Sequence, residues 1–121
     1  MADKTLIVID DDPQITSTLG DLLGKAGVAV KLANSYDEGL AAVKAGGIDF
    51  AVVDLMLADK DGMDLIREIK ALPNPPFIMV LTNSLKSEDV AEAMEEGITT
   101  FLQKADHDPD DIVRTILQKV K

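Results

Sequence analysis

Short apolar runs alternate along the chain with longer segments whose apolar residues recur at helical spacing. The runs predict β-strands and the intervening segments predict α-helices. The predicted strands cover residues 5–9, 28–33, 48–53, 77–81 and 99–103. The first helical segment illustrates the spacing, since its apolar residues share one helix face: Ile15, Leu19, Leu22, Leu23 and Ala26.

Helix start signals precede three of the helical segments. Asp12-Pro13 combines a capping side chain with a proline at the first helical position, and Asp108-Pro109 repeats this signal. The stretch 35–38, Ser-Tyr-Asp-Glu, has the form of a capping box. Glycines or prolines at Gly27, 46–47 and 73–76 indicate where the first three helices end.

The last three helical segments also have one apolar face each, and the face of the third helix is marked by Leu65, Ile66, Ile69 and Leu72. The segment 87–96 predicts a helix with Val90, Ala93 and Met94 facing the core. The last helix presents a regular apolar face made of Ile112, Val113, Ile116, Leu117 and Val120.

Five consecutive strand–helix units predict an α/β fold with a parallel sheet and helices on both faces. The nearly continuous apolar character of the first, third and fourth strands fits a sheet covered on both sides. A doubly wound sheet in the order 2-1-3-4-5 is the leading topology, although periodicity alone leaves the order open. No linker or repeat interrupts the pattern, so we expect a single domain over residues 1–121.

Composition narrows the function classes. The chain has 121 residues, no cysteine and a formal net charge of −10, so disulfide and thiolate metal sites are excluded. The negative charge predicts no direct binding to nucleic acid and no attraction to anionic membranes. The longest apolar run, 77–81, is too short to cross a bilayer, and the polar start 1–4 is unlike a signal peptide, so we expect a cytoplasmic protein.

Polar residues follow four of the five predicted strands. Asp10-Asp11-Asp12 follow the first strand, Asp54 the third, Thr82 the fourth and Lys104 the fifth. In a doubly wound sheet these positions converge at one edge, where ligands bind. Each position alone has an ordinary structural explanation as a cap, a turn residue or a surface charge. Together they predict a site where carboxylates hold Mg²⁺ and one carboxylate forms an acyl phosphate.

The same positions carry a family resemblance. The chain resembles the CheY-like receiver domains of two-component response regulators over essentially its whole length, which implies a CheY-like, flavodoxin-like fold. The positions that match the family pattern are Asp10, Asp11, Asp54, Gly62, Thr82, Phe101 and Lys104. Each match is weak alone, whereas the complete set in the correct order is a strong signal.

The resemblance implies a role for each matching residue. Asp54 is implied to accept a phosphoryl group from the phosphohistidine of a sensor histidine kinase or a histidine phosphotransfer protein. Asp10, Asp11, Asp54 and the backbone carbonyl of Met56 are implied to hold Mg²⁺. Lys104 is implied to contact the phosphoryl group.

Thr82 and Phe101 are implied to form the conformational switch that controls a downstream target, which the sequence leaves unknown. A receiver domain is a signalling module rather than an enzyme, and it catalyses only its own phosphorylation and dephosphorylation.

Three positions depart from the family pattern. Ala58 and Ala105 stand where proline is common, and Asn83 stands where a very small residue is usual. These departures leave the loop geometry and the lifetime of the phosphoryl group open. Because a cis bond before a non-proline residue costs roughly 2.5–4 kcal/mol, we expect a trans bond between Lys104 and Ala105.

Three other functions compete with this interpretation. A phosphohydrolase of the haloacid dehalogenase type would use the first aspartate of an Asp-x-Asp motif, which residues 10–12 contain, but Gln14 departs from that motif. A pseudo-receiver that is never phosphorylated would lack part of the site. A flavodoxin-like FMN binder would need a phosphate loop where this chain has three aspartates.

Overall fold

The computed structural model describes residues 4–58, 60–83, 86–104 and 108–120. Within them, strands and helices alternate strictly along the chain. The strands are β1 (Thr5–Ile9), β2 (Ala29–Ala33), β3 (Phe50–Val53), β4 (Phe77–Thr82) and β5 (Thr100–Gln103). The helices are α1 (Pro13–Lys25), α2 (Tyr36–Lys44), α3 (Gly62–Lys70), α4 (Ser87–Glu95) and α5 (Pro109–Val120).

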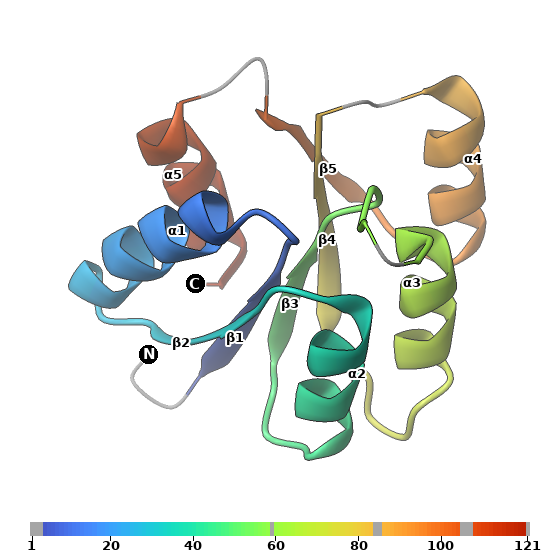
Figure 1. The fold of residues 1–121 in the computed structure, drawn as a ribbon, viewed down its shortest axis with the longest axis horizontal. Coiled ribbons are helices and arrows are strands. Elements are labelled where there is room, and N and C mark those ends of the chain that lie inside the picture. The colour runs from blue at the N-terminus through green and yellow to red at the C-terminus, as the bar shows by residue number, and fades with distance from the viewer. Residues whose placement is uncertain (1–3, 59, 84–85, 105–107, 121) are drawn as a thin grey trace.

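The strands form one parallel sheet in the order β2-β1-β3-β4-β5, which confirms the predicted fold class and topology. Helices α1 and α5 cover one face, and α2, α3 and α4 cover the other (Figure 1). Because all strands run the same way, their carboxyl ends meet at one edge of the sheet. In the described part of the chain, no helix is long and apolar enough to span a membrane.

Each face of the sheet packs against its helices in a separate apolar cluster. On β1, Ile7 and Ile9 point to the α2–α3 side, whereas Leu6 and Val8 point to the α1–α5 side. All four side chains are fully buried. Two-sided burial explains why this strand is apolar throughout instead of alternating, and it fixes β1 rigidly in the middle of the fold.

The predicted helix caps are present. The Asp12 side chain accepts a hydrogen bond from the backbone N–H of Gln14 at 3.0 Å, and Ser35 Oγ accepts one from Glu38 at 3.1 Å. Asp108 caps α5 in the same way. These bonds satisfy N–H groups that a helix leaves without partners at its first turn.

One predicted core position is wrong. Met94 of α4 was expected to face inward, but its side chain is 60% exposed, while Ala93 beside it is fully buried and Val90 is half-buried. The reason is that α4 contacts the domain through a narrow stripe, and Ala93 is its one buried residue. When a helix buries so few residues, the spacing of apolar residues cannot show which of two adjacent positions faces the core.

The strand boundaries also differ slightly from the expected ones. β2, β3 and β5 each begin one or two residues later than the apolar runs suggest, and β4 extends to include Thr82. Before β3, Ile48 is buried, and Asp49 accepts a hydrogen bond from the backbone N–H of Thr5 at 2.9 Å. An apolar residue can therefore join the core without joining the strand ladder.

Met63 is buried and Met94 is exposed, so substitutions at these two residues give a direct test of the packing. Met63→Ala removes a side chain that is 2% exposed and should lower the free energy of unfolding by about 2–5 kcal/mol. Met94→Ala should change it by no more than about 0.5 kcal/mol, because the side chain is mostly in water. Urea denaturation of both variants measures this difference, and equal losses would contradict the placement of α4.

Candidate functional site

Three carboxylates meet at the carboxyl edge of the sheet, as the sequence predicts. Asp10 directly follows β1 and Asp54 directly follows β3, and these two strands pair side by side. The N–H of Asp54 donates to the carbonyl of Ile9 at 3.0 Å, which extends that pairing to the site itself. Asp10, Asp11 and Asp54 each offer one carboxylate oxygen, and these oxygens lie within 4.8 Å of one another.

Lys104, which follows β5, reaches across to both buried carboxylates. Its ammonium nitrogen lies 2.5 Å from Asp10 Oδ2 and 2.8 Å from Asp54 Oδ2, and its side chain is only 10% exposed. Burial lowers the pKa of Lys104, but the contacts with both aspartates outweigh burial and leave this pKa above its ordinary value. The lysine therefore stays charged and neutralises part of the site.

The Asp10 carboxylate is buried and carries its charge at a cost. Its Oδ1 accepts a hydrogen bond from the backbone N–H of Asp12 at 3.0 Å. Its Oδ2 is buried and pairs with the Lys104 charge, but it accepts no hydrogen bond of good geometry from the described residues. Burial raises the pKa of Asp10, and the nearby charge of Lys104 offsets this only in part.

This donor set fits a hard divalent cation. Three carboxylates face the single ammonium of Lys104 among the described residues, so negative charge is left uncompensated at this edge. Carboxylate oxygens are the ligands that Mg²⁺ prefers.

The loop 55–61 between β3 and α3, of which residues 55–58, 60 and 61 are described, holds Asp54 from the other side. The N–H of Met56 donates to Asp54 Oδ1 at 2.9 Å, and Met56 also pairs with Asp61 in an antiparallel bridge. The N–H of Gly62 donates to the carbonyl of Leu55 at 3.0 Å. The resulting turn is so tight that a Cβ on Gly62 would lie 2.3 Å from the carbonyl oxygen of Asp54.

The predicted switch residues lie on the two strands beside the site. Thr82 ends β4 and is fully buried, and Phe101 of β5 is half-buried next to Val80 of β4. Ala58 and Asn83, two of the three departures from the family pattern, are exposed. The third, Ala105, and with it the predicted trans bond after Lys104, lies outside the described residues.

Sequence reasoning missed a polar residue after the second strand. The Asn34 side chain donates to the backbone carbonyl of Asp10 at 2.9 Å and to the Thr16 hydroxyl of α1 at 2.9 Å. It ties the end of β2 to the acidic pair and to the first helix. The available signal was its position directly after β2, at the same edge as the other polar residues.

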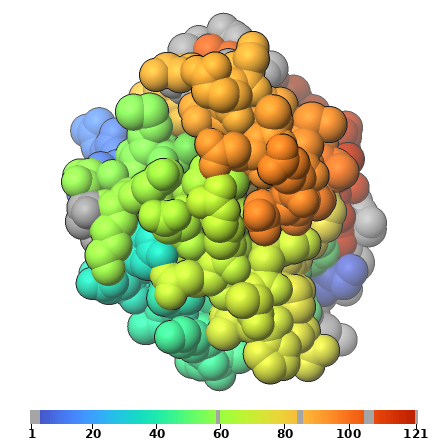
Figure 2. Space-filling view, turned by 90° about the vertical axis from the view of Figure 1, so that its right-hand side faces the viewer, coloured from blue at the N-terminus to red at the C-terminus, as the bar shows by residue number. Residues whose placement is uncertain are grey.

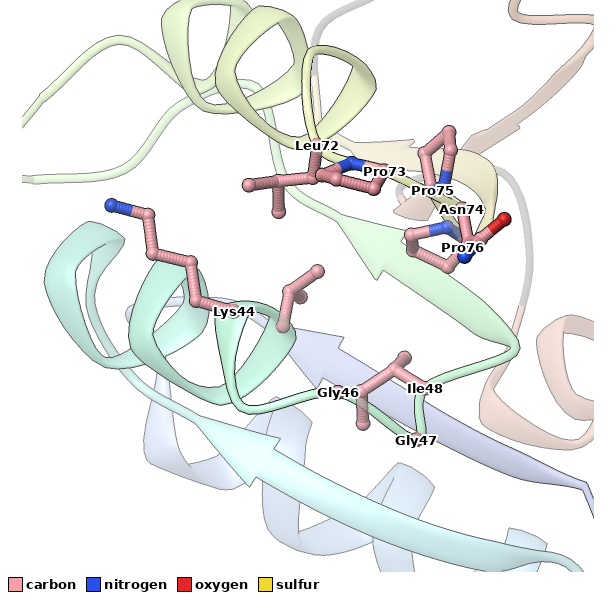
Figure 3. Close-up of a pocket in the computed structure, with 10 residues that line it drawn as sticks. Lys44, Gly46, Gly47, Ile48, Leu72, Pro73, Asn74, Pro75 and Pro76 are labelled. Carbon is pink, nitrogen blue, oxygen red and sulfur yellow. The ribbon is translucent and has the colours of Figure 1, made fainter.

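A cavity of about 320 Å³ lies at the opposite end of the sheet, where β3 and β4 begin. Figure 3 shows it between the end of α2 and the proline-rich segment 72–76. Among the residues described as lining it, Lys44 is the one with a charged side chain. The cavity has no cluster of groups comparable with the acidic edge, which remains the candidate functional site.

Comparison with known proteins agrees with this geometry. Residues 6–117 match the family described as the response regulator receiver domain. The chain belongs to this family. Receiver domains are the phosphorylation-based signalling modules of two-component systems. The predicted family and main function are thereby confirmed.

Relatives and solved structures show the same likeness. This receiver domain is 32% identical over 117 residues to the acid tolerance regulatory protein ActR of Rhizobium meliloti, covering 97% of this chain and 60% of ActR. It is 36% identical over 100 residues to the transcriptional regulatory protein GlrR of Escherichia coli, covering 82% of this chain and 22% of GlrR. The chain therefore spans three fifths or less of these two relatives.

Two solved structures extend the comparison. The chemotaxis response regulator CheY4 of Vibrio cholerae aligns with a TM-score of 0.85 at 24% identity, over 98% of both chains. A response regulator of Burkholderia pseudomallei, solved with a phosphorylated aspartic acid, a calcium ion and citrate, aligns with a TM-score of 0.80 at 31% identity. That alignment covers 92% of this chain and 65% of the other.

The tight turn at Gly62 predicts a large effect of a small substitution. Gly62→Ala should lower the free energy of unfolding by about 1–3 kcal/mol, because the new Cβ would lie 2.5 Å from Leu55 Cα and closer still to the Asp54 carbonyl oxygen. Gly24→Ala is the matched control. Apart from the backbone of α1 itself, no atom of the described residues lies within 4 Å of its added Cβ, so this change should stabilise α1 by about 0.5–1 kcal/mol. Urea denaturation compares them, and similar values would contradict the turn.

The raised pKa of Asp10 predicts that its charge destabilises the receiver domain without metal. This loss of folding free energy is absent below pH 3.8, the ordinary pKa of an aspartate, because Asp10 is then protonated in both the folded and the unfolded state. It is complete above the raised pKa, where Asp10 is charged in both states, so the loss grows as pH rises. Asp10→Asn keeps the acceptor for Asp12 and removes the charge. In EDTA its melting temperature should exceed that of the wild type near neutral pH, and the gap should narrow toward about pH 4. A gap that stays constant with pH would argue against this cause.

Proposed function

We propose that this receiver domain accepts a phosphoryl group on Asp54 and releases it again by hydrolysis. The observation that carries the proposal is the meeting of three carboxylates and Lys104 at the carboxyl edge of the sheet. Asp54 is the member of the acidic trio that contacts both the Lys104 ammonium and the backbone of the neighbouring loop. It also stands alone at the end of β3, facing the acidic pair that follows β1.

We further propose Mg²⁺ as the metal of this site. Asp10, Asp11, Asp54 and the backbone carbonyl of Met56 would hold it. When bound, the metal supplies charge neutralisation for the phosphoryl oxygens and for the crowded carboxylates. A calcium ion and a phosphorylated aspartic acid occur together in the Burkholderia pseudomallei regulator that this chain resembles, which supports the pairing of a cation with an aspartyl phosphate.

The chain's own groups then account for the transfer. A carboxylate oxygen of Asp54 forms a bond to phosphorus while the phosphorus–nitrogen bond of the donor phosphohistidine breaks, and the electron pair returns to the imidazole nitrogen. Lys104 is already at the Asp54 carboxylate and offsets the added negative charge. The Thr82 hydroxyl would donate to a phosphoryl oxygen, and Phe101 would change its packing behind it. The negative charge of the phosphoryl group would thus shift the equilibrium between two conformations of β4 and β5.

The phosphoryl donor in this proposal is a sensor histidine kinase or a histidine phosphotransfer protein. Response regulators receive phosphoryl groups from histidine kinases and act on downstream effectors. The relatives are named as regulatory proteins of acid tolerance and of transcription, and this chain matches part of each.

The haloacid dehalogenase alternative receives no support from the acidic run. In that mechanism Asp12 would have to act at the reaction centre. Here the Asp12 side chain is exposed and caps α1 by accepting from Gln14. The family assignment and this cap both favour the receiver function.

Asp54→Ala should abolish covalent phosphorylation, because it removes the nucleophile, whereas Asp10→Ala should only slow it through the metal. Each protein is incubated with acetyl phosphate and Mg²⁺, and mass spectrometry of the intact chain and its peptides locates any acyl phosphate. Asp21→Ala, an exposed position on α1, is the control for loss of one acidic charge. An acyl phosphate mapped to Asp10 or Asp12 would contradict the proposal.

Mg²⁺ should raise the melting temperature, because it binds the native state and relieves repulsion among the carboxylates. At about ten times its dissociation constant, it stabilises by about 1.4 kcal/mol, or about 4–8 °C for a domain of this size. Asp11→Asn should reduce the shift. Sodium chloride at matched ionic strength is the control, and a melting temperature indifferent to Mg²⁺ at low salt would count against a metal site.

A further inference from the structure

The loop 55–61 carries the Met56 backbone that meets Asp54, yet one of its flanks is open. Its inner side is anchored by Leu55 and Leu57, which are buried in the core. Toward the start of α4 it borders a cavity of about 440 Å³, lined on that helix's side by Lys86 and Asp89. Lys60 also lines this cavity, and on its other side the loop contacts α2.

Lys60 provides a contact with α2. Its ammonium lies 3.2 Å from the carboxylate of Asp37 and 4.7 Å from the centroid of the Tyr36 ring. Both partners belong to the first turn of α2. In Figure 2 the green loop segment and the teal helix α2 are close together on the left of the molecule. One side chain of the loop thus makes an ion pair and a cation–π contact with the same helix end.

The ring under Lys60 is a rigid platform. Tyr36 is 4% exposed and packs in the same apolar cluster as Leu55 and Leu57. Its hydroxyl donates to the Glu68 carboxylate of α3. An exposed ion pair alone contributes little, because two mobile side chains must be ordered. Asp37 is exposed, but the Tyr36 ring, which is the second partner of the ammonium, is already fixed by packing, so the ammonium is placed at a smaller entropic cost.

We propose that Lys60 is a positioning residue, whose ammonium holds the loop 55–61 on α2 and so orients the Met56 backbone toward Asp54. The connection is short. Lys60 precedes Asp61, and Asp61 pairs directly with Met56 across the loop. The inference rests on the proposed function, because the Met56 carbonyl matters only when a cation sits beside Asp54.

The variants Lys60→Met and Lys60→Arg separate charge from packing. Methionine keeps an apolar stem without the ammonium, whereas arginine keeps a cation that can reach both partners. Lys31→Met removes the same charge from an exposed position on the edge strand β2 and serves as the matched control. Three quantities are measured for the full chain: the dissociation constant for Mg²⁺ by calorimetry, the Mg²⁺ concentration that half-saturates phosphorylation by acetyl phosphate, and the melting temperature in EDTA.

Lys60→Met should weaken Mg²⁺ binding about three- to tenfold and raise the half-saturating Mg²⁺ concentration by a similar factor. Its phosphorylation rate at saturating Mg²⁺ and its melting temperature in EDTA should stay near the wild-type values. Lys60→Arg and Lys31→Met should bind Mg²⁺ within about twofold of the wild type. Tyr36 is the sole tyrosine of a chain without tryptophan, so its near-ultraviolet circular dichroism should change in Lys60→Met and not in Lys31→Met.

An unchanged Mg²⁺ affinity in Lys60→Met would overturn the inference even if the Tyr36 signal changed. A lower melting temperature in EDTA, together with a phosphorylation rate that saturating Mg²⁺ does not restore, would assign Lys60 a merely structural role and would also overturn the inference. A wild-type protein that binds Mg²⁺ but is never phosphorylated would refute the proposed function alone, because the calorimetric comparison still decides the role of Lys60. A wild type that binds no Mg²⁺ would refute both.

Discussion

The crowding of negative charge at one sheet edge is the constraint on which the rest of this receiver domain depends. Asp10 and Asp54 are both buried and follow neighbouring strands, and the ammonium of Lys104 lies between them. Like charges in a low-dielectric setting repel strongly, so such a pair persists only where the scaffold enforces it. Lys104 relieves the repulsion in part, and Asp11 adds a third acid. The residual charge is what makes this edge receptive to a cation.

The scaffold enforces this arrangement by burying its central strands on both sides. β1 and β3 pair in the middle of the sheet, and every residue of β1 from Leu6 to Ile9 is fully buried. Moving Asp10 away from Asp54 would require shifting a strand that is packed into two apolar clusters. Polar contacts complete the frame, since Asn34 ties the end of β2 to the Asp10 backbone. The electrostatic repulsion between the carboxylates is thus offset mainly by the packing of the core, and not by the contacts within the site.

The part of the site carried by strand ends could be predicted from the sequence, because parallel pairing brings those ends together whatever their distance along the chain. Asp10, Asp54 and Lys104 are examples. Contacts between loops and helices could not be predicted in this way. The pairing of Lys60 with the first turn of α2 depends on the path of the loop, and the spacing of apolar residues along the chain does not determine that path. The exposure of Met94 depends on how narrowly α4 contacts the core.

The loop 55–61 shows how one restraint can take the place of another. A proline at position 58 would fix the backbone φ angle there through its ring, and this restraint would be insensitive to salt. The chain has Ala58, which leaves that angle free, and it has Lys60, which restrains the loop from outside through an ion pair and an aromatic ring. An exposed ion pair is screened by dissolved ions. The order of this loop, and with it the orientation of the Met56 backbone at Asp54, should therefore weaken as ionic strength rises, in addition to any direct screening of the metal by salt.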